Sequence, residues 1–359
     1  MLKTGSRRAL GLVIVLMVAA CGAVDPPAAS PANPITAPPG SEAVALRLGY
    51  FPNVTHATAL VGDRGGIFER VLGDSVDLQV QNFNAGGEAI EAIFNGGIDM
   101  TYIGPNPAIN GFIRSQGQAV RIIAGATSGG AFFVVREEIE SAADLRGKVV
   151  GSPALGNTQD VALRSWLADR GLETSPDAGG DVSIKPLSNS DILEGFISGS
   201  LDGAWVPEPW ATRMIGQGGK VLVDERDLWP DGQYVTTHLL VATSFLERHP
   251  DVVNRFLQAH LEATDLVNDD PDEAQSLVSE GIAAITGTEM DTGVLSASWE
   301  NLAFTVDPIV ASLEESARDA FELGFLDGYD PEAGLQGIYD VSLLNEVLRD
   351  AGKPEVSLP

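Results

Sequence analysis

Apolar residues between positions 44 and 243 occur in two alternating patterns. Short apolar runs that end at glycine, proline or asparagine are typical of buried strands, and longer stretches with apolar residues at i, i+3 and i+4 are typical of helices. The patterns follow one another as strand, helix, strand, helix and strand, and this order occurs twice. Each half is therefore predicted to be a βαβαβ unit, whose connections suit a parallel sheet.

Beyond about residue 244 the pattern becomes mostly helical. The first of these helices has apolar residues at helical spacing, namely Phe245, Val252, Val253, Phe256, Leu257 and Leu261. Further helices are predicted near residues 273–286, 292–303, 308–324 and 340–351. The segment 234–243 is predicted to be a strand that carries the chain back to the first half.

The two halves also match each other in sequence. "AIFNGGIDMTYIGPNP", from Ala92, aligns with "GFISGSLDGAWVPEPW", from Gly195, so that Asp99 falls on Asp202. Two further blocks match at nearly the same offset, which indicates an internal repeat, although coincidence between glycine-rich sequences stays open. Ligands of parallel α/β sheets bind outside the carboxyl ends of the strands. If the halves face each other, loops from both will line one cleft.

These loop tips carry mostly neutral polar side chains. A helix N-terminus with free N–H groups and a small polar side chain can bind an anion without a cation. Each loop taken alone fits a cap or turn equally well, and Asn157 with Asp160 fits a capping box with aspartate in place of glutamate. The candidate ligand-binding residues are Tyr50, Phe51, Asn53, His56, Asn84, Asn106, Asn157, Thr158, Gln159, Asn189, Glu208 and Trp210.

Several of these side chains have two readings. Glu208, the one charge in these loops, can receive a cationic group of a ligand or accept from neighbouring backbone N–H groups. His56 can face the cleft or pack against a helix. Trp205 and Tyr102 lie inside strand patterns, so they are either cavity walls or core residues.

The first 21 residues fit a targeting segment. Lys3, Arg7 and Arg8 precede an apolar run of 12 residues, shorter than the ~20 that span a membrane. "VAAC" resembles the lipobox of bacterial lipoproteins, so we expect cleavage before Cys21 and its lipidation; an uncleaved anchor is the alternative. "SRR" leaves export by the twin-arginine route open. Residues 22–43 contain six prolines and no apolar periodicity, which predicts a disordered tether.

Charge and composition exclude several classes. The chain has 50 acidic and 22 basic side chains, a net charge of −28, and no basic run, so nucleic-acid binding is excluded. Loss of the three basic leader residues makes the charge −31. Cys21 is the single cysteine and the four histidines are scattered, so neither a disulfide nor a metal site is expected. No cofactor motif occurs and no catalytic set can be assembled from spacing, so we expect no cofactor and no enzyme.

Four segments together resemble the substrate-binding proteins of ABC importers, and most closely the nitrate, sulfonate and taurine group. They are "LRLGYFPNVTHA" from Leu46, "NAGGEAIEAIFNGGIDMTYIGPNPAI" from Asn84, "ADLRGKVVGSPALGNTQDVALRSWL" from Ala143 and "LDGAWVPEPWA" from Leu201. The resemblance implies a type II periplasmic-binding-protein fold, with residues 44–129 and 234–359 as lobe I and 130–233 as lobe II. It implies ligand contacts from the loops that hold Asn53, Asn84, Asn106 and Asn157 to Gln159.

The family also implies a role. We expect a monomeric, lipid-anchored receptor outside the cytoplasmic membrane that delivers a small anion or zwitterion, most closely an aliphatic sulfonate or taurine, to an ABC permease and its ATPase. The "PN-x-x-H" of Pro52, Asn53 and His56 also resembles binders of thiamine pyrimidine precursors, and nitrate or bicarbonate are further alternatives. The alternative class is an enzyme on the same fold, such as a dehydratase or pyrimidine synthase, although the cysteine-rich motif of such synthases is absent.

Overall fold

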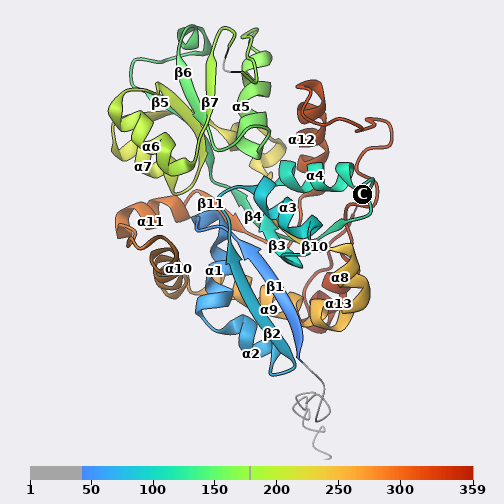
Figure 1. Cartoon of the computed structure of the whole chain (residues 1–359). Coiled ribbons are helices and arrows are strands. Elements are labelled where there is room, and N and C mark those ends of the chain that lie inside the picture. Colours follow the sequence, from blue (N-terminus) through green and yellow to red (C-terminus); the bar gives the residue numbers. More distant parts are fainter. Residues whose placement is uncertain (1–42, 178, 359) are drawn as a thin grey trace, which may run out of the picture. The chain divides into compact units, whose positions relative to one another are not determined.

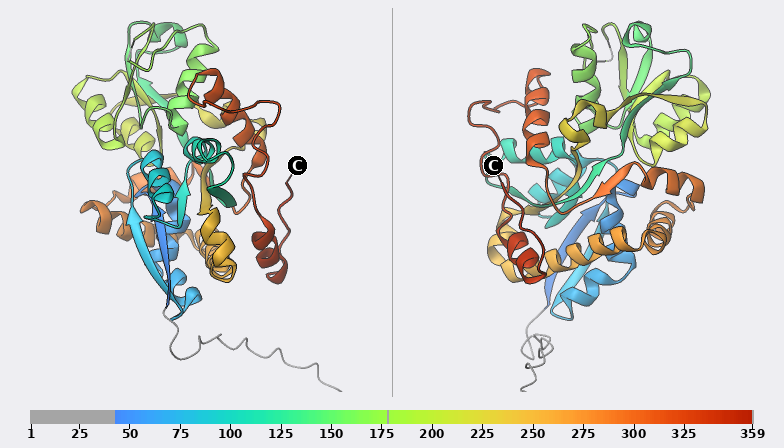
Figure 2. Two further views of the ribbon diagram at one scale, coloured as in Figure 1. Left: turned by 45° about the vertical axis from the view of Figure 1, so that its right-hand side comes forward. Right: turned by 180° about the vertical axis from the view of Figure 1, so that it is seen from behind.

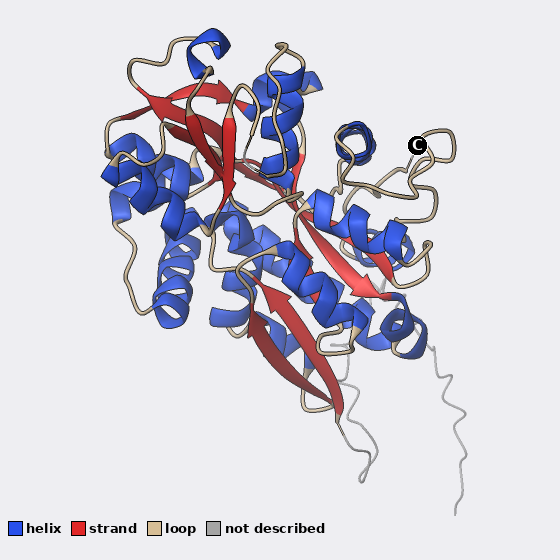
Figure 3. Cartoon of the chain, turned by 45° about the horizontal axis from the view of Figure 1, so that its top comes forward, coloured by secondary structure: helices blue, strands red, loops and turns tan. Residues whose placement is uncertain are grey.

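The computed structural model describes residues 43–177 and 179–358, which belong to one unit, Pro38–Pro359. The predictions for the leader, for Cys21 and for the tether lie outside the described residues. Two sheets organise this part of the chain, and Figures 1 and 3 show them one above the other. We call the first sheet with its helices lobe I and the second sheet with its helices lobe II.

The sheet of lobe I has six strands in the order β11-β4-β10-β3-β1-β2. Its parallel part is the predicted β-α-β-α-β unit, in which β1 lies between β2 and β3. The three other strands run antiparallel, so the sheet is mixed and not purely parallel. The strands are β1 (Val44–Tyr50), β2 (Val76–Asn82), β3 (Met100–Ile103), β4 (Val120–Gly129), β10 (Val235–Ala242) and β11 (Leu302–Phe304).

The sheet of lobe II has five strands in the order β7-β6-β8-β5-β9. Here β6 lies between the parallel strands β7 and β8, as β1 does in lobe I, and β5 and β9 are antiparallel to their neighbours. The strands are β5 (Ala131–Arg136), β6 (Val149–Ser152), β7 (Ser183–Pro186), β8 (Gly203–Pro207) and β9 (Gly219–Asp224).

The internal repeat is confirmed at the level of single hydrogen bonds. In lobe I, the Asp99 carboxylate accepts from the N–H of Arg47 at 3.0 Å. In lobe II, the Asp202 carboxylate accepts from the N–H of Val149 at 2.9 Å. The aligned aspartates therefore occupy the same place, directly before β3 and β8 and beside the central strand. The matching loops at the other ends of these strands are equivalent.

Helices cover both sheets. In lobe I, α9 and α10 contact α1, and α9 also contacts α2 (Figure 2). The lobe I helices are α1 (Ala57–Arg64), α2 (Ile67–Leu72), α3 (Gly86–Phe94), α4 (Pro105–Arg114), α8 (Thr243–Arg248), α9 (Pro250–Asp269), α10 (Pro271–Thr286), α11 (Thr292–Trp299), α12 (Val310–Glu322) and α13 (Ser342–Asp350). Lobe II has α5 (Thr158–Ala168), α6 (Asn189–Ser198) and α7 (Trp210–Gly216). Short 3-10 turns are η1 (Val54–His56), η2 (Ala142–Leu145), η3 (Glu225–Leu228) and η4 (Pro230–Gly232).

The predicted helices of the C-terminal part are present, with two corrections. The first helix, expected to hold both Phe245 and Leu261, is divided at His249 into α8 and α9. The helix expected over 292–303 ends at Trp299, because the next residues form β11 and pair with β4. The apolar residues predicted for the 245–269 segment are buried, and the ring of Phe256 packs against Phe68 at 4.8 Å. Lobe I has one continuous core, and lobe II has separate apolar clusters on the two faces of its sheet.

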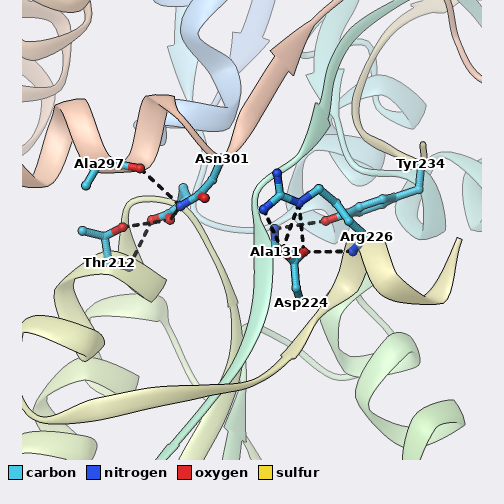
Figure 4. A network of polar contacts seen from close by, with 8 residues as sticks. Ala131, Thr212, Asp224, Arg226, Tyr234, Ala297 and Asn301 are labelled. Carbon is cyan, nitrogen blue, oxygen red and sulfur yellow. Dashed lines mark hydrogen bonds and ion pairs between the residues drawn. The ribbon is translucent and has the colours of Figure 1, made fainter. Parts of the chain in front are cut away.

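Two strand connections join the lobes. Gly129, the last residue of β4, and Gly130, which leads into β5, have φ of 80° and 72°, which glycine adopts without strain. The return segment runs from β9 to β10, and the N–H of Ala131 donates to the Tyr234 hydroxyl at 3.1 Å (Figure 4). Arg226 pairs with Asp224 in the same segment, as Figure 4 also shows. Among the described residues, no helix has both the length and the apolar character that a membrane span requires.

Candidate ligand cavity between the lobes

A cavity of about 430 Å³, part of it open to solvent, lies where the carboxyl ends of the parallel strands of both lobes meet. None of the described residues that line it carries a fixed charge. The lining comes from both lobes and consists of Phe51, Asn53, Thr55, His56, Asn84, Ala85, Gly104, Pro153, Asn157, Thr158, Gln159, Asn189, Pro207 and Thr236.

The repeat explains why these residues meet. Phe51 to His56 follow β1, Asn84 follows β2 and Gly104 follows β3. In lobe II the equivalent loops follow β6, β7 and β8. The segment Asn157–Gln159, which begins α5, therefore takes the position that η1 takes in lobe I. Eight of the twelve predicted residues line the cavity: Phe51, Asn53, His56, Asn84, Asn157, Thr158, Gln159 and Asn189.

Three polar atoms of this lining are buried without a hydrogen-bond partner among the described residues. They are His56 Nδ1, Thr158 Oγ1 and Asn189 Oδ1. His56 and Thr158 are each more than nine-tenths buried. Since most buried polar groups in folded proteins are hydrogen-bonded, a group of such atoms around one cavity indicates a place for a polar ligand. The atoms come from both lobes, so one small ligand can contact both.

The imidazole of His56 is neutral at physiological pH. Burial lowers its pKa to about 3, because the charged form loses its hydration there. The ring packs against Phe51 with 4.6 Å between centroids. His56 therefore offers the cavity a neutral donor or acceptor and no positive charge.

The first turn of α5 is capped in a way that differs from the predicted capping box. Asn157 Oδ1 accepts from the N–H of Thr158 at 2.9 Å. The Asp160 carboxylate accepts from the N–H of Gly156 at 2.9 Å and not from that of Asn157. The N–H groups of Gln159 and Asp160 belong to the first turn and have no acceptor within the helix. The end of α5 therefore presents donors next to the unpartnered hydroxyl of Thr158.

Three predicted residues lie outside the cavity because their polar groups have other partners. The Tyr50 hydroxyl donates to Asp63 at 2.7 Å, and burial is the largest cause that raises its pKa. The Asn106 amide donates to the carbonyl of Ser316 in α12 at 3.2 Å. These side chains stabilise lobe I, and we correct their assignment.

Glu208 is the third correction. Its carboxylate is fully buried and accepts from the backbone N–H and the hydroxyl of Thr212 at 3.1 and 2.8 Å, and from the Asn301 amide at 2.7 Å. Ser298 Oγ lies 3.1 Å away. Figure 4 shows the side chains of Thr212 and Asn301 close to one another. These contacts match the structural reading, and they link the loop after β8 to α11 and to the turn that follows α11, across the lobes.

Trp210 lies at the rim of the cavity and not in its lining. Its indole N–H donates to Asn53 Oδ1 at 3.0 Å, from lobe II to lobe I. The Arg213 guanidinium lies over the same indole, 4.8 Å from the ring centroid. Trp205 and Tyr102, whose two readings were open, are fully buried core residues.

Sequence reasoning missed some parts of the site. Gly104 follows directly after β3 and Pro207 is the last residue of β8, so their places in the repeat could have indicated them. A Cβ atom at Gly104 would lie 2.7 Å from Thr158 Oγ1, which shows how closely the lobes approach. Arg164 was also missed, although its spacing from Asp160 on one helix face predicts an ion pair. The pair is formed at 2.9 Å.

The sequence profile of the NMT1-like family matches residues 39–282. The taurine-binding periplasmic protein of Escherichia coli strain K12 is 26% identical over 208 residues, which are 57% of this chain and 61% of that protein. The nitrate/nitrite binding protein NrtA of Nostoc is 24% identical over 267 residues, 66% of this chain and 57% of NrtA. The match thus spans about three fifths of the length of these two relatives. The riboflavin-binding protein RibY of Chloroflexus aurantiacus is 24% identical over 339 residues, 89% of this chain and 88% of RibY.

Solved structures show the same fold. The alkanesulfonate-binding protein SsuA of Xanthomonas axonopodis pv. citri, bound to MOPS, superimposes with a TM-score of 0.65 at 18% identity, covering 80% of this chain and 96% of SsuA. The periplasmic nitrate-binding protein NrtA of Synechocystis PCC 6803 gives 0.69 at 17% identity, covering 87% and 90%. The predicted fold class, that of the two-lobed periplasmic binding proteins, is confirmed.

Proposed function

We propose, from the premise that the chain belongs to the NMT1-like family, that this protein is an extracytoplasmic receptor delivering a small oxyanion to an ABC importer. The observation that carries the proposal is the uncharged polar cavity between the lobes, with unpartnered buried atoms on both sides. Taurine, nitrate and alkanesulfonate are named as ligands of related or similarly folded proteins. An aliphatic sulfonate or a taurine-like compound is the ligand that we favour, with nitrate or bicarbonate as alternatives.

Neutral donors suit a weakly hydrated anion in a protein of this charge. The chain carries a net charge of −28, but screening over ~10 Å in ~0.1 M salt weakens the field of distant carboxylates. The end of α5, the Thr158 hydroxyl and the Gln159 amide can donate to the anion directly. Short-range hydrogen bonds therefore favour binding more than the distant charges oppose it.

A riboflavin-like or aminopyrimidine ligand is the second candidate, supported by the long match to RibY and by the "PN-x-x-H" segment. Flat ring systems are usually held by apolar and aromatic walls. Phe51 and His56 are the aromatic members of the described lining, and they pack against each other. Asparagine and threonine make up much of the remainder. The lining therefore favours an oxyanion over a large ring.

We propose that the lobes, residues 44–129 with 234–359 and residues 130–233, close on the ligand about their two connections, as hinge closure in binding proteins requires. The contact of Trp210 with Asn53 and the Glu208 network then belong to the closed form. Cys21 would carry the lipid that holds this monomeric receptor at the membrane, where it meets the permease.

A thermal-shift panel on residues 22–359 tests the proposal. Taurine, alkanesulfonates, sulfate, nitrate, bicarbonate, aminopyrimidines and riboflavin are each added. A ligand at about 100 times its Kd stabilises by ~2.7 kcal/mol, and ~2–4 °C per kcal/mol for a large domain gives a shift of roughly 5–10 °C. A shift with the ring compounds and none with the oxyanions would make a ring compound, and not an oxyanion, the favoured ligand. Formation of a product from the stabilising compound would identify an enzyme instead.

The site assignment has its own test. Thr158→Ala combined with Gln159→Ala removes side-chain donors at the start of α5, and we expect at least tenfold weaker anion binding because each lost donor to an anion is worth ~1.5–3 kcal/mol. The matched control is Thr288→Ala combined with Gln217→Ala, since both residues are exposed and outside the cavity lining. Equal affinity in the two double variants would disprove the assignment.

A further inference from the structure

A buried ion pair lies one turn behind the cavity, inside α5. Asp160 and Arg164 are joined at 2.9 Å, and their side chains are 0% and 2% exposed. The carboxylate also accepts from the Ser152 hydroxyl at 2.6 Å and from the N–H of Gly156 at 2.9 Å. Asp160 therefore holds the loop that leads from β6 to the cavity, and it places a negative charge in the first turn of α5.

Arg164 is held from the other side. Its Nη1 donates to the carbonyl of Ser175 at 3.1 Å, and its guanidinium lies over the ring of Phe325, 5.5 Å from the centroid. Its Nη2 is buried and has no hydrogen-bond partner in the part of the chain that the structure describes. A buried cation held in this way needs its carboxylate, and the carboxylate needs the cation. Together the two charges sum to zero.

This neutrality matters because of where the pair lies. The start of α5 lines the cavity, and the buried hydroxyl of Thr158 and Nδ1 of His56 beside it have no partner within residues 43–177 and 179–358. A carboxylate in the first turn would repel an anion bound there if no cation compensated it. Arg164 removes that repulsion without entering the cavity lining.

We infer that the Asp160–Arg164 pair determines which ligand charge the site accepts. Because the pair is neutral, the site binds monovalent oxyanions and rejects divalent ones. The inference rests on the proposed function and narrows its substrate class. The helix end supplies the equivalent of about half a positive charge, and the lining adds donors but no cation. One negative charge is balanced by these groups, whereas the second charge of sulfate or hydrogen phosphate would be buried without compensation.

Isothermal titration with methanesulfonate and sulfate at one ionic strength tests this on the purified protein. Wild type should bind methanesulfonate at least tenfold more tightly than sulfate. Arg164→Met leaves the carboxylate unopposed and should weaken methanesulfonate binding at least tenfold. Asp160→Asn leaves the guanidinium unopposed and should narrow or reverse the preference. The double variant Asp160→Asn/Arg164→Met is neutral again and should regain the preference for methanesulfonate.

Two further variants separate charge from structure. Arg164→Lys keeps the charge but loses the guanidinium contacts, and it should retain the preference. Arg170→Met removes an exposed arginine of the segment that follows α5, and it should behave as wild type. If Arg164→Met does not fold, Asp160→Asn and the double variant still decide the question. Equal loss for both anions in every variant, or sulfate binding as tight as methanesulfonate in wild type, would overturn the inference. Wild type that binds neither anion would overturn the inference and would also remove simple sulfonates as the favoured ligands of the proposed function.

Discussion

A substitution at Glu208 distinguishes a structural role of this residue from a role in ligand recognition. Its two oxygens accept from the Thr212 N–H, the Thr212 hydroxyl and the Asn301 amide, and the residue is fully buried. Glu208→Gln keeps the shape of the side chain and replaces one oxygen by an NH₂ group. If NH₂ replaces Oε1, it faces the Asn301 amide; if it replaces Oε2, it faces the Thr212 N–H. Both arrangements put two donors together.

The magnitude follows from these contacts. At least one hydrogen bond to a charged acceptor is lost, worth ~1.5–3 kcal/mol, and one buried donor is left unsatisfied. We expect Glu208→Gln to lower the free energy of unfolding by about 2–4 kcal/mol. At ~2–4 °C per kcal/mol, the Tm should fall by roughly 4–16 °C.

The assay combines calorimetry with ligand titration. Tm is compared among wild type, Glu208→Gln and Glu289→Gln, a control at an exposed residue. Kd values for taurine and ethanesulfonate are then measured for each protein. Because Glu208 does not line the cavity, both affinities should change by the same factor. An unchanged Tm together with a selective loss of taurine binding would refute this reasoning and make Glu208 the partner of the ligand's ammonium group.

Three further variants test other contacts. Trp210→Phe removes the 3.0 Å donor to Asn53 and should weaken binding of every ligand about 2- to 10-fold through faster release, measured by stopped-flow fluorescence. Gly104→Ala would place a methyl group against the Thr158 hydroxyl and should weaken anion binding at least tenfold by titration; unchanged affinity would show that the loops can separate without loss. Burial raises the pKa of Glu225 to about 7 in the folded protein, so stability from this group is present below its ordinary value of 4.5 and is lost as pH rises through 7. Glu225→Gln lacks this loss of stability, so its Tm relative to that of wild type should rise between pH 5 and pH 8. The rise should correspond to about a few kcal/mol at most. A Tm difference that stays constant with pH would contradict the assigned burial of Glu225.

The sequence predicted the cavity well because the repeat fixes where the loops lie. Once Asp99 and Asp202 are recognised as equivalent, the loops that follow the parallel strands must gather at one edge of each sheet. Loop residues whose side chains make no distant contact, such as Asn84 and Asn189, could be placed from this rule alone.

The rule fails where a side chain in the same loops has a distant partner. Glu208 meets Ser298 and Asn301, and Asn106 meets Ser316, 210 positions along the chain. All three partners lie in the helical part after residue 244, whose packing no local pattern specifies. The early end of α11 has the same origin, since β11 forms only because β4 is available to pair with it.

Ligand choice and lobe closure depend on different residues. A ligand that contacts His56 in lobe I and Thr158 in lobe II favours the closed form by the free energy of the contacts that the open form lacks. The measured Kd then contains the closure equilibrium as a common factor. Contacts at the rim, such as Trp210 with Asn53, change that factor and shift the Kd of all ligands together. Lining residues and the Asp160–Arg164 pair act on particular ligands, so they change the ratio of two Kd values. The ratio therefore reports the chemistry of the cavity even in a variant whose closure is impaired.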